Sequence, residues 1–156
     1  MGIISPKKQN VASKALIAFF VLILSPILLV AVLCYLLYGA ILYLAIWITW
    51  RKKFVIFVYS NSPTWKEYME REILPHLQDR AVILNWSKRR NWKNSFAVLA
   101  FRYFGGYRNF NPIAIVFRPF RFVKTYRFYE AFKEHKHGNP KKVEKLKRAL
   151  LNDVGI

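Results

Sequence analysis

The hydrophobic and polar positions divide this chain into one long apolar run followed by a region of short alternating elements. Ala15 to Trp50 is a run of 36 residues without a charged side chain. Basic residues flank it on both sides: Lys7, Lys8, Lys14, Arg51, Lys52 and Lys53. A membrane-crossing helix needs about 20 apolar residues, so the run exceeds one pass and falls short of two. It predicts a basic tail over 1–14, a membrane-embedded helical segment over 15–50 and a basic domain over 51–156.

Ser25 and Pro26 interrupt the apolar run and divide it into arms of about 11 and 24 residues. Proline removes one backbone hydrogen bond from a helix and bends its axis. Two arrangements follow: a re-entrant hairpin that turns near this pair, or one long kinked helix that crosses once. Because basic flanks favour the cytoplasmic side, we expect the hairpin, with both flanks and the domain facing the cytosol.

The residues around this break also resemble a known membrane anchor. Phe20 to Leu29, with Ser25-Pro26 at its centre, resembles the helix-break-helix anchor of the monotopic phosphoglycosyl transferases. The resemblance implies only the geometry of the anchor. The adjacent Asp-Glu pair that this family uses in catalysis does not occur downstream, so its activity is not implied.

After Lys53 the hydrophobic period changes to that of a small α/β domain. Four apolar, β-branched or aromatic runs predict strands over 54–59, 81–86, 113–117 and 123–129. Helices are expected after Thr64, over 96–104, over 130–137 and over 141–152, with a basic loop over 87–94. Thr64 and Glu67 have the spacing of a capping box, and Pro75 is expected to end or kink the first helix. The pattern predicts a three-layer α/β fold with a mixed or parallel sheet.

The order of these elements resembles the thioredoxin-like fold. Asn111-Pro112 stands before the third strand, where that fold carries a cis-proline. Ser60-Asn61-Ser62-Pro63 stands where that family places its redox cysteines, so thiol chemistry is excluded. A flavodoxin-like or TIR-like sheet is the alternative, because those folds also begin with a strand, a serine-containing loop and an acidic helix.

Charge indicates the kind of partner. The chain has a net charge of +18, and the part from Arg51 onward carries 23 of the 26 basic residues and all eight acids. We expect this domain to lie on an anionic membrane surface. Nucleic acid is a less favoured partner, since a tethered domain meets lipid phosphates first.

Cys34 is the only cysteine, and His135 and His137 cannot share a helix face, so we expect neither a metal nor a cofactor.

Two basic clusters interleaved with aromatic residues are the candidate ligands for anionic lipid or phosphate. They contain Lys88, Arg89, Arg90 and Lys93, and Arg118, Arg121, Lys124 and Arg127, with Arg108 between them. Candidate ligand loops contribute Ser60, Asn61, Ser62, Gly105, Gly106, Asn109 and Asn111. Ordinary turns are the favoured explanation of these loops, and charges on an edge strand serve to block strand pairing.

These features together predict a non-catalytic module. We expect a membrane-anchored binding or accessory protein whose basic domain docks on anionic lipid or on an acidic partner, including as a subunit of a larger membrane complex. The alternative is a transferase or hydrolase acting on a membrane-borne phosphate substrate. No general base, nucleophile, P-loop or dinucleotide fingerprint is evident in the sequence to support that alternative.

Overall fold

The fold is described from a computed structural model, which covers residues 6–50, 52–106 and 111–156, with the side chains of residues 6–12 left out. The contacts divide the chain into two compact units, residues 1–38 and 39–156. Twelve residues of the apolar run, Gly39–Trp50, therefore belong to the second unit rather than to the first.

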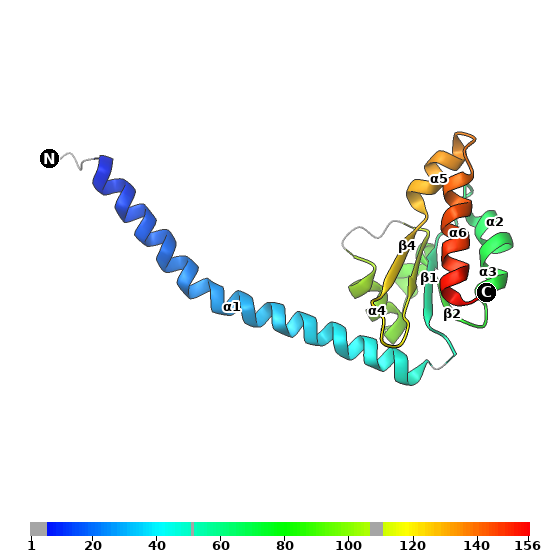
Figure 1. The fold of residues 1–156 in the computed structure, drawn as a ribbon, viewed down its shortest axis with the longest axis horizontal. Helices are drawn as coiled ribbons and strands as arrows, with labels where there is room; N and C mark the ends of the chain where they lie inside the picture. The colour runs from blue at the N-terminus through cyan, green and yellow to red at the C-terminus, as the bar shows by residue number, and fades with distance from the viewer. Residues whose placement is uncertain (1–5, 51, 107–110) are drawn as a thin grey trace. The chain divides into compact units, whose positions relative to one another are not determined.

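Helix α1 spans Pro6–Thr49 and continues through Pro26 (Figure 1). The hairpin expected at Ser25-Pro26 is wrong, because residues 6–49 form a single helix without a turn. The Ser25 hydroxyl donates to the carbonyl of Leu22 at 3.4 Å, and a proline in an apolar helix is tolerated where neighbouring groups compensate for the lost hydrogen bond. By length and composition Ser13–Thr49 is a candidate membrane span, and a signal sequence meets the same criteria.

The second unit is built on a mixed four-stranded sheet. Its strands are β1 (Val55–Tyr59), β2 (Ala81–Asn85), β3 (Ile113–Val116) and β4 (Lys124–Arg127), in the spatial order β2-β1-β3-β4. Strands β1 and β2 are parallel, while β3 is antiparallel to both β1 and β4. The predicted α/β domain with a mixed sheet is confirmed. Strand β4 lies at an edge, and its residues are mostly exposed.

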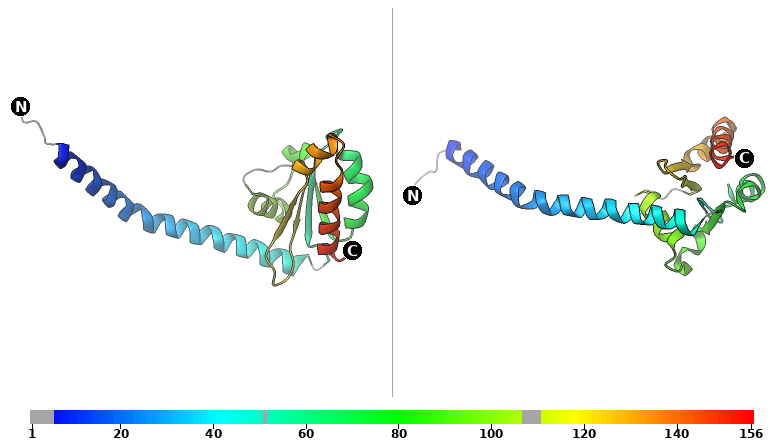
Figure 2. Two further views of the ribbon diagram at one scale, coloured as in Figure 1. Left: turned by 45° about the horizontal axis from the view of Figure 1, so that its top comes forward. Right: turned by 60° about the horizontal axis from the view of Figure 1, so that its bottom comes forward.

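One face of the sheet is covered by the segments α2 (Lys66–Tyr68), η1 (Met69–Ile73) and α3 (Leu74–Leu77), and by α5 (Tyr129–Lys136) and α6 (Lys141–Val154). Alternate β1 residues, Val55 and Phe57 among them, point into this layer because successive strand side chains face opposite sides. They pack with Ile73, Phe128 and Phe132, each 1% exposed or less. Figure 2 shows these helices from two further directions.

The other face is covered by α4 (Phe96–Phe104) and by the last turns of α1. Ile56 and Val58 of β1 point to this side and share a cluster with Phe101 and Ile46, which is 1% exposed. Gly39 approaches α4 so closely that an added Cβ would lie 2.3 Å from the ring of Tyr103. The core of the domain therefore includes a segment that the sequence pattern assigned to the membrane.

Local differences from the expected elements have simple causes. The capping box is wrong: the Thr64 hydroxyl caps nothing, and the Ser62 carbonyl instead accepts from the N–H of Lys66 at 3.0 Å. The helix before Pro75 widens into the π-helical turn η1, which lets the chain enter α3 despite the proline. The expected basic loop is largely the 3₁₀-helix η2 (Trp86–Asn91), capped by the Asn85 side chain.

Candidate functional site

The strand register separates the predicted binding residues into two groups at opposite ends of the sheet. Strand β1 runs from Val55 to Tyr59. We call the end of the sheet at Val55 the entry edge and the end at Tyr59 the carboxyl edge; both lie across the ends of the strands and are distinct from the edge strands. The register places the start of β4 at the entry edge and the end of β4 at the carboxyl edge. A five-residue strand spans about 17 Å, so the two predicted basic clusters do not form one continuous site.

The loop after β1, at the carboxyl edge, is closed by hydrogen bonds to the end of β2. The Asn85 amide donates to Asn61 Oδ1 at 2.7 Å, and the Asn61 N–H donates to Ser87 Oγ at 3.0 Å. Trp65 Nε1 donates to Ser60 Oγ at 3.2 Å. The polar groups predicted to bind a ligand thus satisfy one another and order this turn.

Further predicted loop residues meet β4 at the same edge. The Arg127 guanidinium donates to the carbonyl of Gly105 at 3.0 Å, and Gly106 adopts a φ of 78°, which glycine permits. Asn111 is 8% exposed, its Oδ1 has no hydrogen-bond partner among the described residues, and its bond to Pro112 is cis. Arg108 and Asn109 lie outside the described residues.

The first basic cluster lies on η2 and the residues that follow it. The side chains of Lys88, Arg89, Arg90 and Lys93 are exposed. Arg89 stacks over the ring of Trp86 at 5.1 Å. The two tryptophans of this segment, however, pack inward: Trp86 and Trp92 each meet the buried ring of Phe101, at 5.9 and 5.8 Å. The cluster therefore presents cations to solvent while its aromatic rings belong to the core.

The entry edge has the opposite arrangement, because two of its aromatic rings are exposed. Phe120 and Phe122, in the connection between β3 and β4, are 92% and 97% exposed. The ring of Phe120 meets that of Trp47 from α1 at 5.5 Å. The Tyr43 hydroxyl donates to the main-chain carbonyls of Arg118 and Arg121. These contacts hold the β3–β4 connection against the end of α1, a pairing that nothing in the sequence signalled.

Charge at the entry edge is partly neutralised by one carboxylate. Asp153 of α6 lies 2.8 Å from Lys124 and 3.8 Å from Arg118, and also accepts from the Tyr126 hydroxyl. The hydrogen bonds from Lys124 and then Tyr126 lower the pKa of Asp153, whereas burial and Asp153 raise the pKa of Tyr126. Arg121 is exposed. This edge therefore combines a partly neutralised cluster with an exposed arginine beside the exposed rings of Phe120 and Phe122.

A cavity of about 550 Å³ also lies at the entry edge. Among the described residues, its walls are mainly aromatic and Arg118 is the single charged one; they comprise Tyr43, Ile46, Trp47, Ile48, Trp50, Phe54, Phe117, Arg118 and Pro119. Its volume falls within the range of small-molecule sites, about 300–1,000 Å³. All of these residues belong to the second unit.

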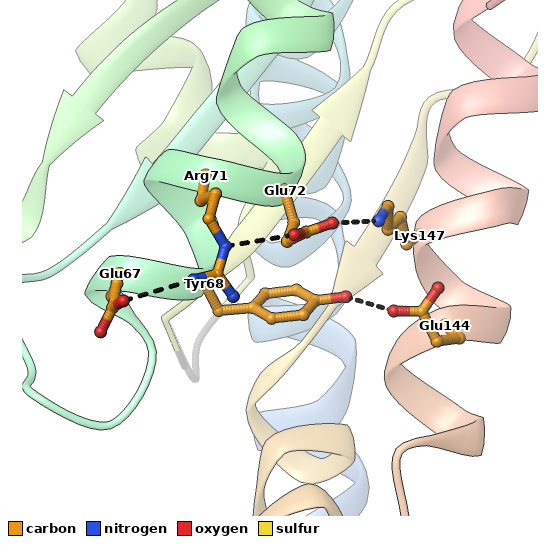
Figure 3. Close-up of polar contacts among 6 residues, drawn as sticks. All are labelled: Glu67, Tyr68, Arg71, Glu72, Glu144 and Lys147. Carbon is orange, nitrogen blue, oxygen red and sulfur yellow. Dashed lines mark hydrogen bonds and ion pairs between the residues drawn. The ribbon is translucent and has the colours of Figure 1, made fainter.

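A polar network joins the segments α2 and η1 to helix α6 (Figure 3). The Tyr68 hydroxyl donates to Glu144 at 2.7 Å, and Lys147 donates to Glu72 at 2.8 Å. The hydrogen bond from Lys147 lowers the pKa of Glu72, and burial followed by Glu144 raises that of Tyr68. These groups attach the layer of α2 and η1 to α6, and they are already paired. Over the described part of the chain, no three potential metal ligands gather.

Comparison of the chain with models of protein families, with curated proteins and with solved structures finds no match.

Proposed function

We propose that this chain is a membrane-anchored binding module whose α/β domain docks on anionic lipid through its entry edge. The observation that carries the proposal is the pair of exposed rings, Phe120 and Phe122, beside the exposed indole of Trp47. Large exposed apolar groups are costly in water and mark interaction sites. Aromatic side chains together with Arg or Lys are typical of the membrane interface.

The length of α1 supports one membrane crossing. Ala15 to Tyr38 provides about 24 residues, or about 36 Å of helix, which crosses a hydrocarbon core of about 30 Å with some tilt. The twelve residues left over are those that pack in the domain. The excess of the run over a single pass is thereby explained without a hairpin.

The charge distribution supports a cytosolic domain. The part from Arg51 onward carries 23 basic residues, whereas three lysines precede the apolar run. The flank richer in Lys and Arg stays in the cytoplasm. Each cation close to an anionic surface contributes about 1 kcal/mol. At physiological salt the Debye length is about 8 Å, so Arg121 is within range of lipid while Lys88, Arg89 and Arg90 are not.

If the entry edge contacts the membrane, the carboxyl edge is available to bind a second, acidic partner. Exposed cations of η2 lie there beside the ordered loop of Ser60 and Asn61. A thioredoxin-like fold for residues 54–151 belongs to the same proposal, supported by the order of the elements and of the strands in the sheet. In that fold this edge would hold a partner without thiol chemistry, because no cysteine stands near it.

A spin label tests the docking of the entry edge. In a Cys34→Ser background, the full chain with Phe122→Cys carries a nitroxide and is reconstituted into nanodiscs of phosphatidylcholine with or without phosphatidylglycerol. We expect oxygen to reach the label more readily than a water-soluble nickel complex, most strongly in anionic discs. Thr125→Cys, exposed on the same hairpin, is the matched control and should remain in water. Equal nickel access at both positions contradicts the proposal.

A second measurement separates an anchor from a signal sequence. If α1 anchors the mature protein, the amino-terminal sequence of the membrane-bound chain begins before Ala15. A mature chain that begins after the apolar run would refute the anchor.

A further inference from the structure

We infer that the cavity at the entry edge holds one hydrocarbon chain of an anionic phospholipid whose phosphate lies at Arg118. This inference rests on the proposed function, because it requires the entry edge to lie at the bilayer. It goes further by assigning a binding site and the chemical class of its ligand.

The walls of the cavity suit a hydrocarbon chain. Five of its side chains are aromatic, namely those of Tyr43, Trp47, Trp50, Phe54 and Phe117. The Tyr43 hydroxyl is already used, since it donates to the carbonyls of Arg118 and Arg121. What remains for a ligand inside the cavity is mostly apolar surface, which favours an apolar group over water.

Arg118 suits the phosphate of such a lipid. Its guanidinium has five N–H donors, and its contacts to Asp153 and to the carbonyl of Asn152 are long, at 3.8 and 3.4 Å. Arginine pairs with phosphate through two parallel hydrogen bonds. The exposed Arg121 lies three residues away on the same connection, and adds attraction for a negative headgroup.

The surroundings select a membrane lipid over other apolar ligands. Ile48, which also lines the cavity, is 66% exposed, as are the neighbouring Ile41 and Leu44 at 63% and 49%. One lining residue of the cavity is therefore an exposed apolar side chain of α1, the helix that also carries the exposed Ile41 and Leu44. A lipid at the proposed membrane contact can place a chain in the cavity while its headgroup stays at the arginines.

Native mass spectrometry of the full chain tests this site. The protein is released from nanodiscs of equal phosphatidylcholine and phosphatidylglycerol into a mild detergent, and bound lipids are counted. We expect one retained phospholipid per chain, mainly phosphatidylglycerol. Ile48→Trp fills the mouth of the cavity and should reduce retention about tenfold, which corresponds to about 1.4 kcal/mol.

Matched variants make the result decisive. Ile41→Trp introduces the same ring at an equally exposed isoleucine of α1 that does not line the cavity, and should retain lipid normally. Arg118→Gln should abolish the preference for phosphatidylglycerol, and Arg118→Lys should restore it in part. Equal retention by the Ile48 and Ile41 variants, or a lipid-free dimer, overturns the inference. The nitroxide at position 122 reports separately: if it lies in lipid while retention is equal, only the cavity assignment fails.

Discussion

The Tyr43 hydroxyl donates to the main-chain carbonyl of Arg118, 75 positions later in the chain. This bond joins the end of the apolar helix to the β3–β4 connection and closes one side of the entry-edge cavity. The last turns of α1 therefore belong to the folded domain, whereas the sequence alone predicted that they lie in the membrane.

Removal of that hydroxyl should loosen the junction. We expect Tyr43→Phe to lower the free energy of unfolding by about 1 kcal/mol, because two carbonyl acceptors lose their donor. Denaturant unfolding of the full chain in detergent, followed by near-UV circular dichroism, measures this. Phe122→Leu, a change at a ring that is 97% exposed, serves as the control and should leave the midpoint unchanged.

The buried side chain of Ile46 should matter more. Ile46→Ala leaves a cavity between α1 and the sheet, and we expect a loss of about 2–5 kcal/mol. Ile41→Ala on the same helix, where the side chain is 63% exposed, should change stability by less than about 0.5 kcal/mol. Similar losses for both variants would show that α1 does not pack on the sheet.

Where a soluble fragment begins should decide whether it folds. A fragment of residues 39–156 keeps Leu42 and Ile46, whereas one of residues 52–156 loses the part of α1 that, together with α4, covers the sheet face formed by Ile56 and Val58. Each buried Leu or Ile contributes about 1.5–3 kcal/mol. We expect dispersed amide resonances from the longer fragment in mild detergent and aggregation of the shorter one. A well-folded 52–156 fragment would contradict the boundary at Gly39.

Acid should weaken the domain through Asp153 and Glu72. Hydrogen bonds from lysine hold the pKa of each carboxyl below its usual value. Groups with a lowered folded-state pKa add stability above their unfolded pKa of about 4, and this stability is lost as the pH falls further. Asp153→Asn should therefore lower stability at pH 7 and flatten the decline below pH 4. Asp79→Asn, at an exposed carboxyl, is the matched control for stability at pH 7; a loss there as large as that of Asp153→Asn would contradict the assignment.

Binding to anionic vesicles should depend more on the exposed arginine of the entry edge than on those of the carboxyl edge. We expect Arg121→Glu to weaken flotation of the 39–156 fragment with vesicles containing phosphatidylglycerol by roughly tenfold or more, at about 1 kcal/mol per unit of charge. Arg90→Glu makes the same change at an exposed arginine of the carboxyl edge and should have a smaller effect. A larger effect at Arg90 would place the membrane at the other edge.

The strands and most helices of the domain could be predicted because their signals are local. The run from Phe54 to Tyr59 is continuously apolar since both faces of β1 are covered. Helix α4 begins and ends at the expected residues, with Ser95 as its cap. Predictions failed where several neighbouring groups could make the same hydrogen bond. The capping box predicted at Thr64 is an example, because the Ser62 carbonyl accepts the hydrogen bond from the Lys66 N–H instead.

The candidate site was predictable only as a set of residue types. Arginine and lysine beside aromatic rings indicate contact with anions, but the sequence does not show whether Trp86 points inward or Phe120 points outward. Both orientations depend on Phe101 and on the end of α1, which are distant in sequence.

The sequence by itself determined the apolar run, the strongly basic domain, the absence of paired cysteines and the α/β order of elements. Only the tertiary structure decided that the helix has no turn at Pro26, that Gly39–Trp50 belongs to the domain, and that Lys124 and Arg127 of the second basic cluster lie at opposite edges. The physical reason is that hydrophobic burial has no direction. The sequence of an apolar helix has the same pattern whether lipid or a sheet covers the helix. Which charged side chains are neighbours depends on the packing and register of elements that are distant in sequence.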